Sequence, residues 1–567
     1  MKKIVFKGCF LMSILSVVTL FNSCSTIKEL EYNVTENPLQ MHADDVTLQI
    51  NGKFIEKGLN AKATADVTPI FVCNDGTEIA FQTEMFQGPK AAGNGKVVPK
   101  EGTSFSYSST IPYQKCMEEG VIKVRVLAKK GDKEEELYSD KIADGTVITP
   151  YLIQLDDQVI AAKDAFQRIT SHNMDAVINF NKGQATVKSS ELKDQDIVDL
   201  MDFALDATTN PRREMKSINV QSYASPEGEI DKNENLAKDR AESAKAAVVK
   251  KMKKMKFEAG QADTFYSLDP KGEDWSGFKT EVEKTTHEDK ELILRVLQMT
   301  TDLNKREQEI RNMAKTYTFL EKEVLPQLRR SQLSLSYDKV GFSDEELKEL
   351  SKTNPDTLNV EELLFTATLY DDLSEQLRVY SEALRLFPND WRTANNVGYV
   401  QYLQGDLDAA GTSFEKASQA SENETVNNNI GAVAHMKGDR ERAMELFTAA
   451  GSSSETKYNM GLLNIQQGLY DEAVTNMGAN NTFNSALANL LSGDADAATQ
   501  AIDESNAKEE AMSYYLKAII GARTNNSETM MDNLKIAFEK DGDLKSKAKR
   551  DREFIQYFEN ADFLAIF

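Results

Sequence analysis

The sequence has few cysteine and histidine residues, and this scarcity argues against the common metal sites. It contains 4 cysteines and 4 histidines. The histidines are scattered singly, and the cysteine spacings match no zinc motif. We therefore expect no metal site.

Positive charge and long hydrophobic runs are also scarce. Lys and Arg total 67 against 90 Asp and Glu, which gives a net charge of −23. A surface of this sign repels a phosphate backbone, so we expect no nucleic-acid partner. No apolar run reaches the roughly 20 residues that a membrane-spanning helix needs. We expect no spanning helix in the mature chain.

Catalytic motifs are missing as well. The sequence has no Gly-x-Ser-x-Gly, no phosphate-binding Gly-x-x-x-x-Gly-Lys, no His-Glu-x-x-His and no Rossmann glycine pattern. A hydrolase would need a pair of catalytic carboxylates, and no motif points to one. We expect a protein that is not an enzyme and that holds no cofactor.

Length and composition predict a chain of several folded domains. The 567 residues exceed what one hydrophobic core organises, and at 40% hydrophobic and 28% charged the composition is globular. The pattern predicts an N-terminal β-sandwich, a central α/β domain and a C-terminal all-α region.

The N-terminus reads as a secretion signal. Lys2, Lys3 and Lys7 precede a short apolar run that ends at Phe21, and Cys24 follows. The pattern resembles a bacterial lipobox, although Phe21 replaces the usual Leu. The resemblance implies a signal peptide over 1–23, acylation of Cys24, a lipidated tether over 24–43 and an outer-membrane location facing the periplasm. The alternative is a plain signal peptide with a chance cysteine.

Residues 44–155 alternate polar and apolar positions between turn signals, which predicts the β-sandwich. Its two cysteines, Cys73 and Cys116, belong to an exported protein. They either form a disulfide or are two buried small side chains.

Residues 165–340 mix strand and helix patterns. The string Ser222-Tyr223-Ala224-Ser225-Pro226-Glu227-Gly228, followed by Asn233, Leu236, Ala237, Arg240 and Ala241, resembles the OmpA-like peptidoglycan-binding domain. The helix half matches the family pattern, whereas Ser225 replaces the turn Asp. A charged helical insertion at about 270–325 precedes Arg329-Arg330 and a strand, an ending that resembles Bacteroidetes lipoproteins. The insertion either covers a ligand groove or adds a docking surface.

The resemblance implies a ligand site. In the family, the turn Asp and the helix Arg hold the diaminopimelate group of the peptide stem, so Arg240, Asn233 and Ser225 are the expected peptidoglycan ligands. Helical spacing places Asn233 and Arg240 on a flanking face, which predicts that Arg240 is not a core residue. The alternative is a solvated helix Arg in a domain kept only for its fold.

Residues 358–567 contain an internal repeat. Gly398, Gly431 and Gly461 are each followed by Gly seven residues later, by Ala twelve later, and by Phe414, Phe447 or Met477 sixteen later. Small residues let two antiparallel helices approach, and the large residue fills the gap beneath. The pattern identifies about six tetratricopeptide (TPR) repeats, a solenoid whose concave face binds extended peptides or proteins. Unrelated helical hairpins are the alternative.

Two functional hypotheses follow. In the first, a lipoprotein contacts peptidoglycan through the OmpA-like domain and scaffolds envelope or exported proteins on its repeats. In the second, a surface or secretion- and fimbria-associated adaptor has lost wall binding. The missing turn Asp and the acidic tract Lys28-Glu29-Leu30-Glu31 favour the second hypothesis.

Overall fold

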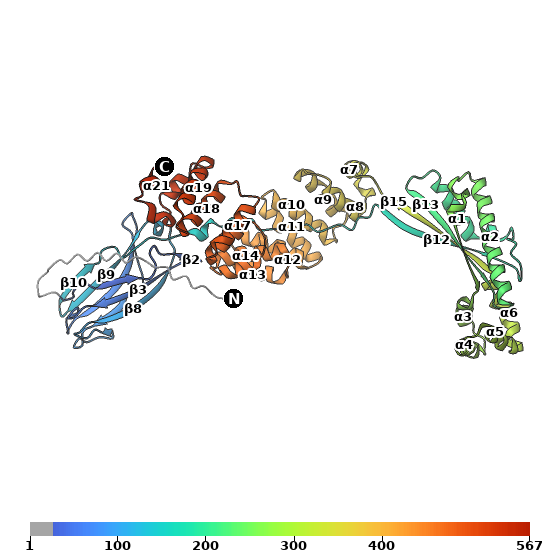
Figure 1. Cartoon of the computed structure of the whole chain (residues 1–567), viewed down its shortest axis with the longest axis horizontal. Helices are drawn as coiled ribbons and strands as arrows, with labels where there is room; N and C mark the ends of the chain where they lie inside the picture. The colour runs from blue at the N-terminus through green and yellow to red at the C-terminus, as the bar shows by residue number, and fades with distance from the viewer. Residues whose placement is uncertain (1–25) are drawn as a thin grey trace. The chain divides into compact units, whose positions relative to one another are not determined.

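The computed structural model describes residues 26–567, which form two compact units. The first unit contains the chain up to Ala162 together with Pro388–Phe567, and the second contains Lys163–Phe387. Figure 1 shows β-strands in the N-terminal region, a mixed α/β middle and helices in the C-terminal region. The predicted signal peptide and Cys24 lie outside the described residues.

The N-terminal region of the first unit is built from two β-sheets around one core. Ile50 and Phe54 of one sheet and Phe71 and Val124 of the other belong to the same buried cluster. The first sheet contains β1 (Glu31–Val34), β2 (Met41–His42), β3 (Asp45–Phe54) and β8 (Thr103–Pro112). The second contains β4 (Thr64–Val72), β5 (Glu78–Ala80), β6 (Glu84–Gln87), β7 (Lys96–Val97), β9 (Val121–Lys130), β10 (Lys133–Tyr138) and β11 (Ala143–Asp144).

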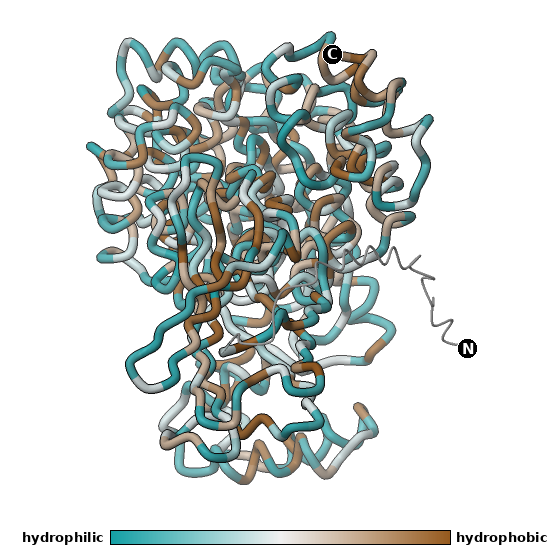
Figure 2. The backbone as a smooth tube through the Cα atoms, turned by 90° about the vertical axis from the view of Figure 1, so that its left-hand side faces the viewer, coloured by the Kyte–Doolittle hydropathy of each residue, from teal (hydrophilic) through white to brown (hydrophobic). Residues whose placement is uncertain are grey.

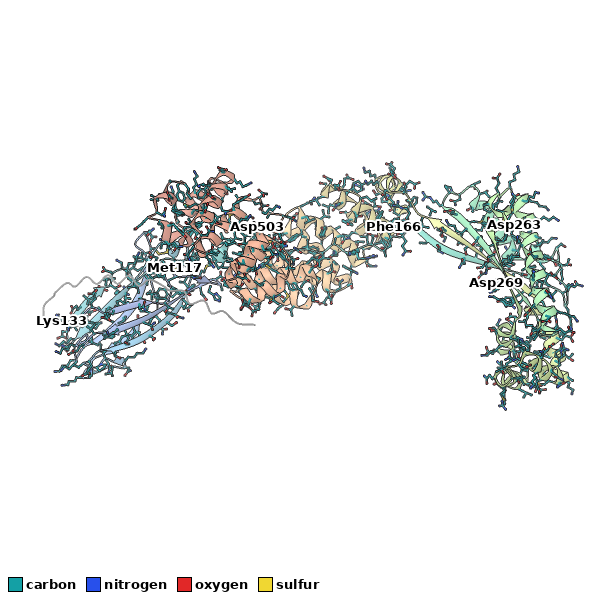
Figure 3. The ribbon with its side chains drawn as sticks, viewed as in Figure 1. Met117, Lys133, Phe166, Asp263, Asp269 and Asp503 are labelled. Carbon is teal, nitrogen blue, oxygen red and sulfur yellow. A yellow bond between two sulfur atoms is a disulfide. The ribbon has the colours of Figure 1, made fainter. Side chains whose placement is uncertain are left out.

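Alternation explains this β region. Along β3 and β9 every second residue is buried, because successive side chains of a strand point to opposite faces. Figure 2 shows hydrophobic and hydrophilic stretches interleaved along the chain. In Figure 3, Lys133 marks the start of β10, and Met117 in the short helix η1 (Lys115–Glu118) is fully buried.

The predicted tether is wrong for residues 26–43. β1 pairs antiparallel with β3, Ile27 bridges Leu59, and Ile27, Leu30 and Leu39 are buried in the β core. These apolar residues are three and nine positions apart, a spacing without strand periodicity, so the sequence pattern did not reveal their pairing. This β region therefore begins near the first described residue.

The second unit is a mixed α/β fold. Its sheet has the order β12 (Ile169–Asn179), β15 (Arg330–Val340), β13 (Arg213–Ala224) and β14 (Tyr266–Glu273). β13 runs parallel to β14, and the other neighbours are antiparallel. Helices α1 (Gln195–Ala207) and α2 (Ile230–Lys254) share one buried core with the sheet. β14 was not predicted. Residues 270–273, expected to begin the helical insertion, are the last residues of this strand.

The rest of the insertion is helical, as expected. It contains α3 (Trp275–Lys284), α4 (Lys290–Met299), α5 (Leu303–Asn312) and α6 (Ala314–Glu323), which have a small core of their own. After β15 come α7 (Asp344–Thr353), α8 (Val360–Thr368) and α9 (Leu373–Leu386), which complete the second unit.

The C-terminal helices of the first unit form antiparallel pairs, which confirms the predicted TPR repeat. A Cβ atom on Gly398, Gly431 or Gly461 would lie 2.7, 2.7 or 2.6 Å from the side chain sixteen residues later, so only glycine permits this helix spacing. The glycine seven residues later takes a positive φ in each hairpin turn. The pairs are α10 (Trp391–Leu403) with α11 (Leu407–Ala420), α12 (Glu424–Met436) with α13 (Arg440–Ala449), α14 (Ser454–Gln466) with α15 (Tyr470–Met477), α16 (Phe483–Ser492) with α17 (Ala495–Glu504), and α18 (Ala511–Arg523) with α19 (Ser527–Lys540).

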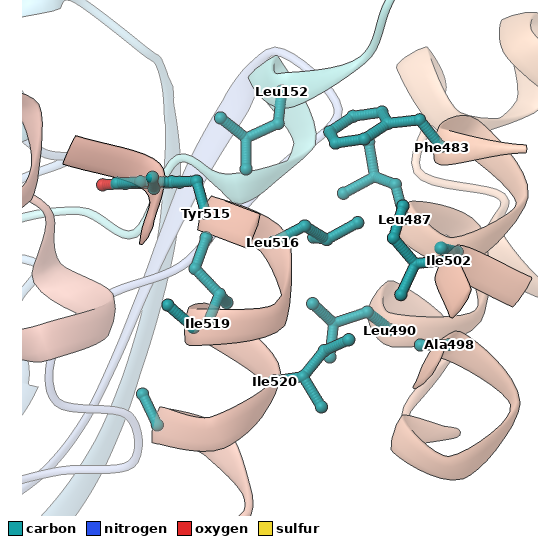
Figure 4. Close-up of a cluster of buried hydrophobic side chains, with 14 of the residues drawn as sticks. Leu152, Phe483, Leu487, Leu490, Ala498, Ile502, Tyr515, Leu516, Ile519 and Ile520 are labelled. Carbon is teal, nitrogen blue, oxygen red and sulfur yellow. The ribbon is translucent and has the colours of Figure 1, made fainter. Parts of the chain in front are cut away.

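The β region is joined to these helices by a short helix, η2 (Thr149–Leu152). Leu152 belongs to the same buried cluster as Phe483, Leu487 and Leu516 of the repeats (Figure 4). The chain segment that follows η2 therefore starts from a fixed position against α16 and α18.

Candidate functional site

Residues 153–162, here called the strap, have neither helix nor strand structure and are held by asparagine side chains of the repeats. Each of four strap residues has its N–H and its C=O bonded to the carboxamide of one asparagine, at 2.7 to 2.9 Å. The pairs are Gln154 with Asn484, Gln158 with Asn459, Ile160 with Asn429 and Ala162 with Asn396.

These asparagines come from the first helices of four successive hairpins, α16, α14, α12 and α10. All four are at most 1% exposed. Asn428 and Asn395 donate further bonds to the carbonyls of Gln158 and Ile160. Every second residue of an extended chain presents its N–H and C=O to the same side, and a carboxamide offers the matching acceptor and donors. The repeats therefore recognise the strap through hydrogen bonds to its backbone.

Two adjacent strap carboxylates are bound by side chains of the same repeats. Asp157 lies 2.7 Å from Nδ1 of His435, whose Nε2 lies 2.9 Å from Gln466, and both members of the pair are buried. Both Asp156 oxygens accept from the Tyr458 hydroxyl at 2.9 Å. The surface of the repeats that contacts the strap is here called the groove. It binds the backbone of the strap through asparagines and the carboxylates of Asp156 and Asp157 through Tyr458 and His435.

Burial and pairing shift the pKa values of these groups. Burial raises the pKa of Asp157 and outweighs the opposing effect of His435. Burial alone would lower the pKa of His435, but the hydrogen bond and charge of Asp157 outweigh it, so the pKa is raised. Burial likewise raises the pKa of Asp156. The raised pKa of His435 favours the imidazolium form opposite Asp157.

Of the three residues predicted to bind peptidoglycan, the structure brings Ser225 and Asn233 into contact, whereas Arg240 has other partners. Ser225 follows β13, and Asn233 and Arg240 lie on α2. Asn233 Nδ2 donates to the Ser225 carbonyl at 3.4 Å and to Glu273 at 2.8 Å. All three are buried, at 4%, 6% and 0% exposure.

The expectation that Arg240 lies outside the core is wrong. Its guanidinium donates to the backbone carbonyls of Asn181, Gln184 and Tyr223 at 2.7 to 3.1 Å, and its Cζ lies 5.2 Å from the Phe180 ring centroid. Burial, with the nearby charge of Arg329, lowers the pKa of Arg240 to about 10. The loop after β12 covers this face of α2, which helical periodicity alone could not reveal. Arg240 therefore fixes the loop after β12 to the end of β13.

A second arginine contacts Ser225. Arg329 Nε lies 3.3 Å from the Ser225 hydroxyl, and its guanidinium pairs with Glu227 at 2.9 Å. Ser225 donates to the same Glu227 oxygen at 2.6 Å, while Lys182 lies 3.2 Å from the other oxygen. Both side chains of the Arg329–Glu227 pair are below 10% exposure. Glu227, a carboxylate of the chain itself, thus occupies the anion-binding position beside the Arg329 guanidinium.

The remaining site predictions concern the cysteines, metals and the membrane. The structure joins Cys73 and Cys116 in a disulfide with a Cα–Cα distance of 5.5 Å, whereas the predicted lipidation site Cys24 lies outside the described residues. Across residues 26–567, no group of three or more His, Cys, Asp or Glu side chains is arranged to hold a metal ion. Among the helices in the same range, none has both the length and the hydrophobicity of a membrane-crossing segment.

Sequence reasoning missed the asparagine ladder, although a signal exists. Asn396, Asn429 and Asn459 each stand two residues before the first glycine of their repeat. A polar residue at a fixed position beside a packing glycine is buried in each repeat, and burial of a carboxamide requires partners. That recurrence indicates a ligand in the groove, but not which segment fills it.

Comparisons with known proteins give likenesses to TPR structures. No protein-family model and no curated sequence matches the chain. The YrrB structure, described as a TPR protein with an unusual peptide-binding site, is 19% identical, covers 36% of this chain and 100% of its own, and has a TM-score of 0.22. Pseudomonas aeruginosa PilF is 15% identical over 38% of this chain and 98% of its own, with a TM-score of 0.29. A tetratricopeptide repeat protein from Parabacteroides merdae is 18% identical over 37% and 91%, with a TM-score of 0.28. These scores are too low to support a function.

Proposed function

We propose that the protein is a non-enzymatic outer-membrane lipoprotein, anchored through Cys24, that scaffolds envelope proteins through its repeats and contacts peptidoglycan through the region resembling an OmpA-like domain. The asparagine ladder carries the scaffolding part of the proposal, because four repeats present carboxamides that bind an extended backbone. Solenoids of this kind commonly use the concave face for partner recognition.

The cluster around Ser225 supports the wall contact. A stem carboxylate would take the place of Glu227 beside Arg329, since an Arg guanidinium binds carboxylates bidentately. In this proposal Arg329 supplies the charge, Ser225 and Asn233 supply hydrogen bonds, and Arg240 keeps the surrounding loops in place.

A specific observation favours the second candidate, a surface or secretion- and fimbria-associated adaptor without wall binding. Glu227 already pairs with Arg329, and Arg240 is engaged by three backbone carbonyls. Displacing a buried carboxylate requires the ligand to replace all of its contacts. A closed cluster of this kind is consistent with a fold retained as scaffold.

Co-sedimentation with purified sacculi separates the two candidates. The chain from residue 25 to 567 is compared with Glu227→Gln, which frees the guanidinium, and with Arg329→Gln, which removes it. Wall binding predicts that the wild type pellets, that E227Q pellets at least as well and that R329Q stays in solution. If none of the three pellets while all melt cooperatively, the adaptor role replaces wall binding.

A further inference from the structure

The groove holds the strap with many hydrogen bonds as well as apolar contacts, which sets it apart from a purely apolar seam. The residues that hydrogen-bond to the strap are asparagines, Tyr458 and His435, all of which can hydrogen-bond to water once the strap leaves. Val159 of the strap also packs against the hydrophobic clusters that contain Phe414 and Phe447. Of the strap side chains, Asp157 is 5% exposed, whereas Leu155 is 42% exposed. No apolar side chain of residues 153–162 is fully buried, although Ile153 and Val159 are partly buried against hydrophobic clusters. Apolar burial, the term that usually fixes a segment in place, is therefore incomplete along the strap.

The bonds to the strap are also transferable from one peptide to another. They reach the backbone at Gln154, Gln158, Ile160 and Ala162, so any extended chain can supply the same donors and acceptors. The intervening strap residues make no backbone hydrogen bond to the asparagines. One of them, Asp157, accepts a hydrogen bond at its carbonyl from the Tyr402 hydroxyl at 3.2 Å. Affinity for a backbone of this kind depends little on sequence.

One side-chain position does depend on sequence. His435 is 1% exposed and faces Asp157, with Gln466 on its other nitrogen and Arg440 acting on it at longer range. A carboxylate at this position completes a charged hydrogen bond to the buried imidazole at 2.7 Å, and a neutral side chain would make a weaker one. Tyr458 adds a hydroxyl donor for the carboxylate one residue earlier.

We propose that the groove is an exchangeable peptide-binding site, that residues 153–162 are its built-in ligand, and that its partner is an extended protein segment with an Asp-Asp pair at the positions of Asp156 and Asp157. The proposal rests on the scaffolding role of the repeats and is independent of wall binding. Because the strap is tethered, its effective concentration is high, and a partner competes only when the strap is weakened or the partner is abundant.

The test uses a fluorescently labelled peptide with the sequence of residues 152–164, titrated into the chain from residue 25 to 567. In Asp157→Asn the strap keeps its shape but loses its charge, so we expect the labelled peptide to bind about ten-fold or more tightly than it binds the wild type. Adding Asn459→Ala to D157N removes the partner of Gln158 and should abolish binding. A second peptide with Asn in place of the second Asp should bind D157N about ten-fold more weakly.

Equal binding to wild type and D157N, or binding that survives Asn459→Ala, would place the peptide outside the groove and overturn the proposal. Absence of binding to a D157N chain that melts cooperatively would show that the strap is a permanent part of the fold. If D157N does not fold, Ala162→Pro, which weakens the opposite end of the strap, replaces it with the same expected gain. Sacculus pelleting of the same proteins reports on wall binding, so the two failures are distinguishable.

Discussion

A pair of neighbouring alanines offers a matched test of backbone recognition. Ala162 donates its N–H to Asn396 Oδ1 at 2.7 Å and accepts from Nδ2 of the same side chain at 2.9 Å. The N–H of Ala161 has no hydrogen-bond partner within residues 26–567. Proline removes the N–H and favours extended backbone. The substitutions Ala162→Pro and Ala161→Pro therefore differ chiefly in one bonded amide.

The expected effect of Ala162→Pro follows from the geometry. At an N···O distance of 2.7 Å there is no room for the proline ring carbon, so Asn396 must move and both bonds to the strap are lost. Asn396 is 1% exposed and keeps a bond from Asn395 at 3.1 Å, which limits the penalty. Two neutral hydrogen bonds at about 1 kcal/mol each give about 2 kcal/mol of lost stability.

Thermal unfolding of the full chain, followed by calorimetry, measures the difference. About 2 kcal/mol corresponds to a fall of roughly 3 °C in the transition of the first unit, since a unit of this size has a large unfolding entropy. Ala161→Pro should change the transition little or raise it slightly, since proline also reduces the freedom of the unfolded chain. Equal transitions for the two variants would refute backbone recognition by Asn396.

Three further predictions concern buried groups elsewhere. Arg240→Ala should lower the free energy of unfolding of the second unit by about 3 kcal/mol or more, because three backbone carbonyls lose a charged donor; an unchanged urea midpoint would contradict this role. Reduction of Cys73–Cys116, which closes a loop of sequence separation 43, should destabilise the β region by about 4 kcal/mol, and a denaturation midpoint insensitive to reductant would argue against the bond. Because the folded-state pKa of His435 is raised, its stabilisation is complete below its ordinary pKa of about 6.5 and is lost as pH rises through the raised value. The wild-type melting temperature should therefore fall more than that of His435→Gln between about pH 6 and pH 8, and parallel curves would contradict the Asp157 pairing.

Repeated local patterns made the helical region predictable. Gly398, Gly431 and Gly461 and the large residues sixteen positions later encode helix contacts within one hairpin, and the structure places each pair in contact. Such contacts are short-range, so the chain's own spacing specifies them. The same holds for the alternating strands of the β region.

Long-range contacts explain what the sequence did not reveal. The strap lies 234 residues from Asn396 along the chain, and its own residues show no periodicity. Arg240 looks like a flanking residue on α2, but carbonyls from the distant loop at Asn181 and Gln184 cover it. Both features depend on which segment folds over which surface, and a single sequence does not specify that.

Hydrogen exchange resolved to single amides tests the central claim, that the repeats hold the strap by its backbone. The amides of Gln154, Gln158, Ile160 and Ala162 are bonded to asparagines, whereas among residues 26–567 those of Leu155, Val159 and Ala161 have no hydrogen-bond partner. We predict slow exchange at the bonded positions and fast exchange at the alternate ones, since exchange requires the hydrogen bond to open. Uniformly fast exchange across residues 153–162 would show that the groove does not hold the strap.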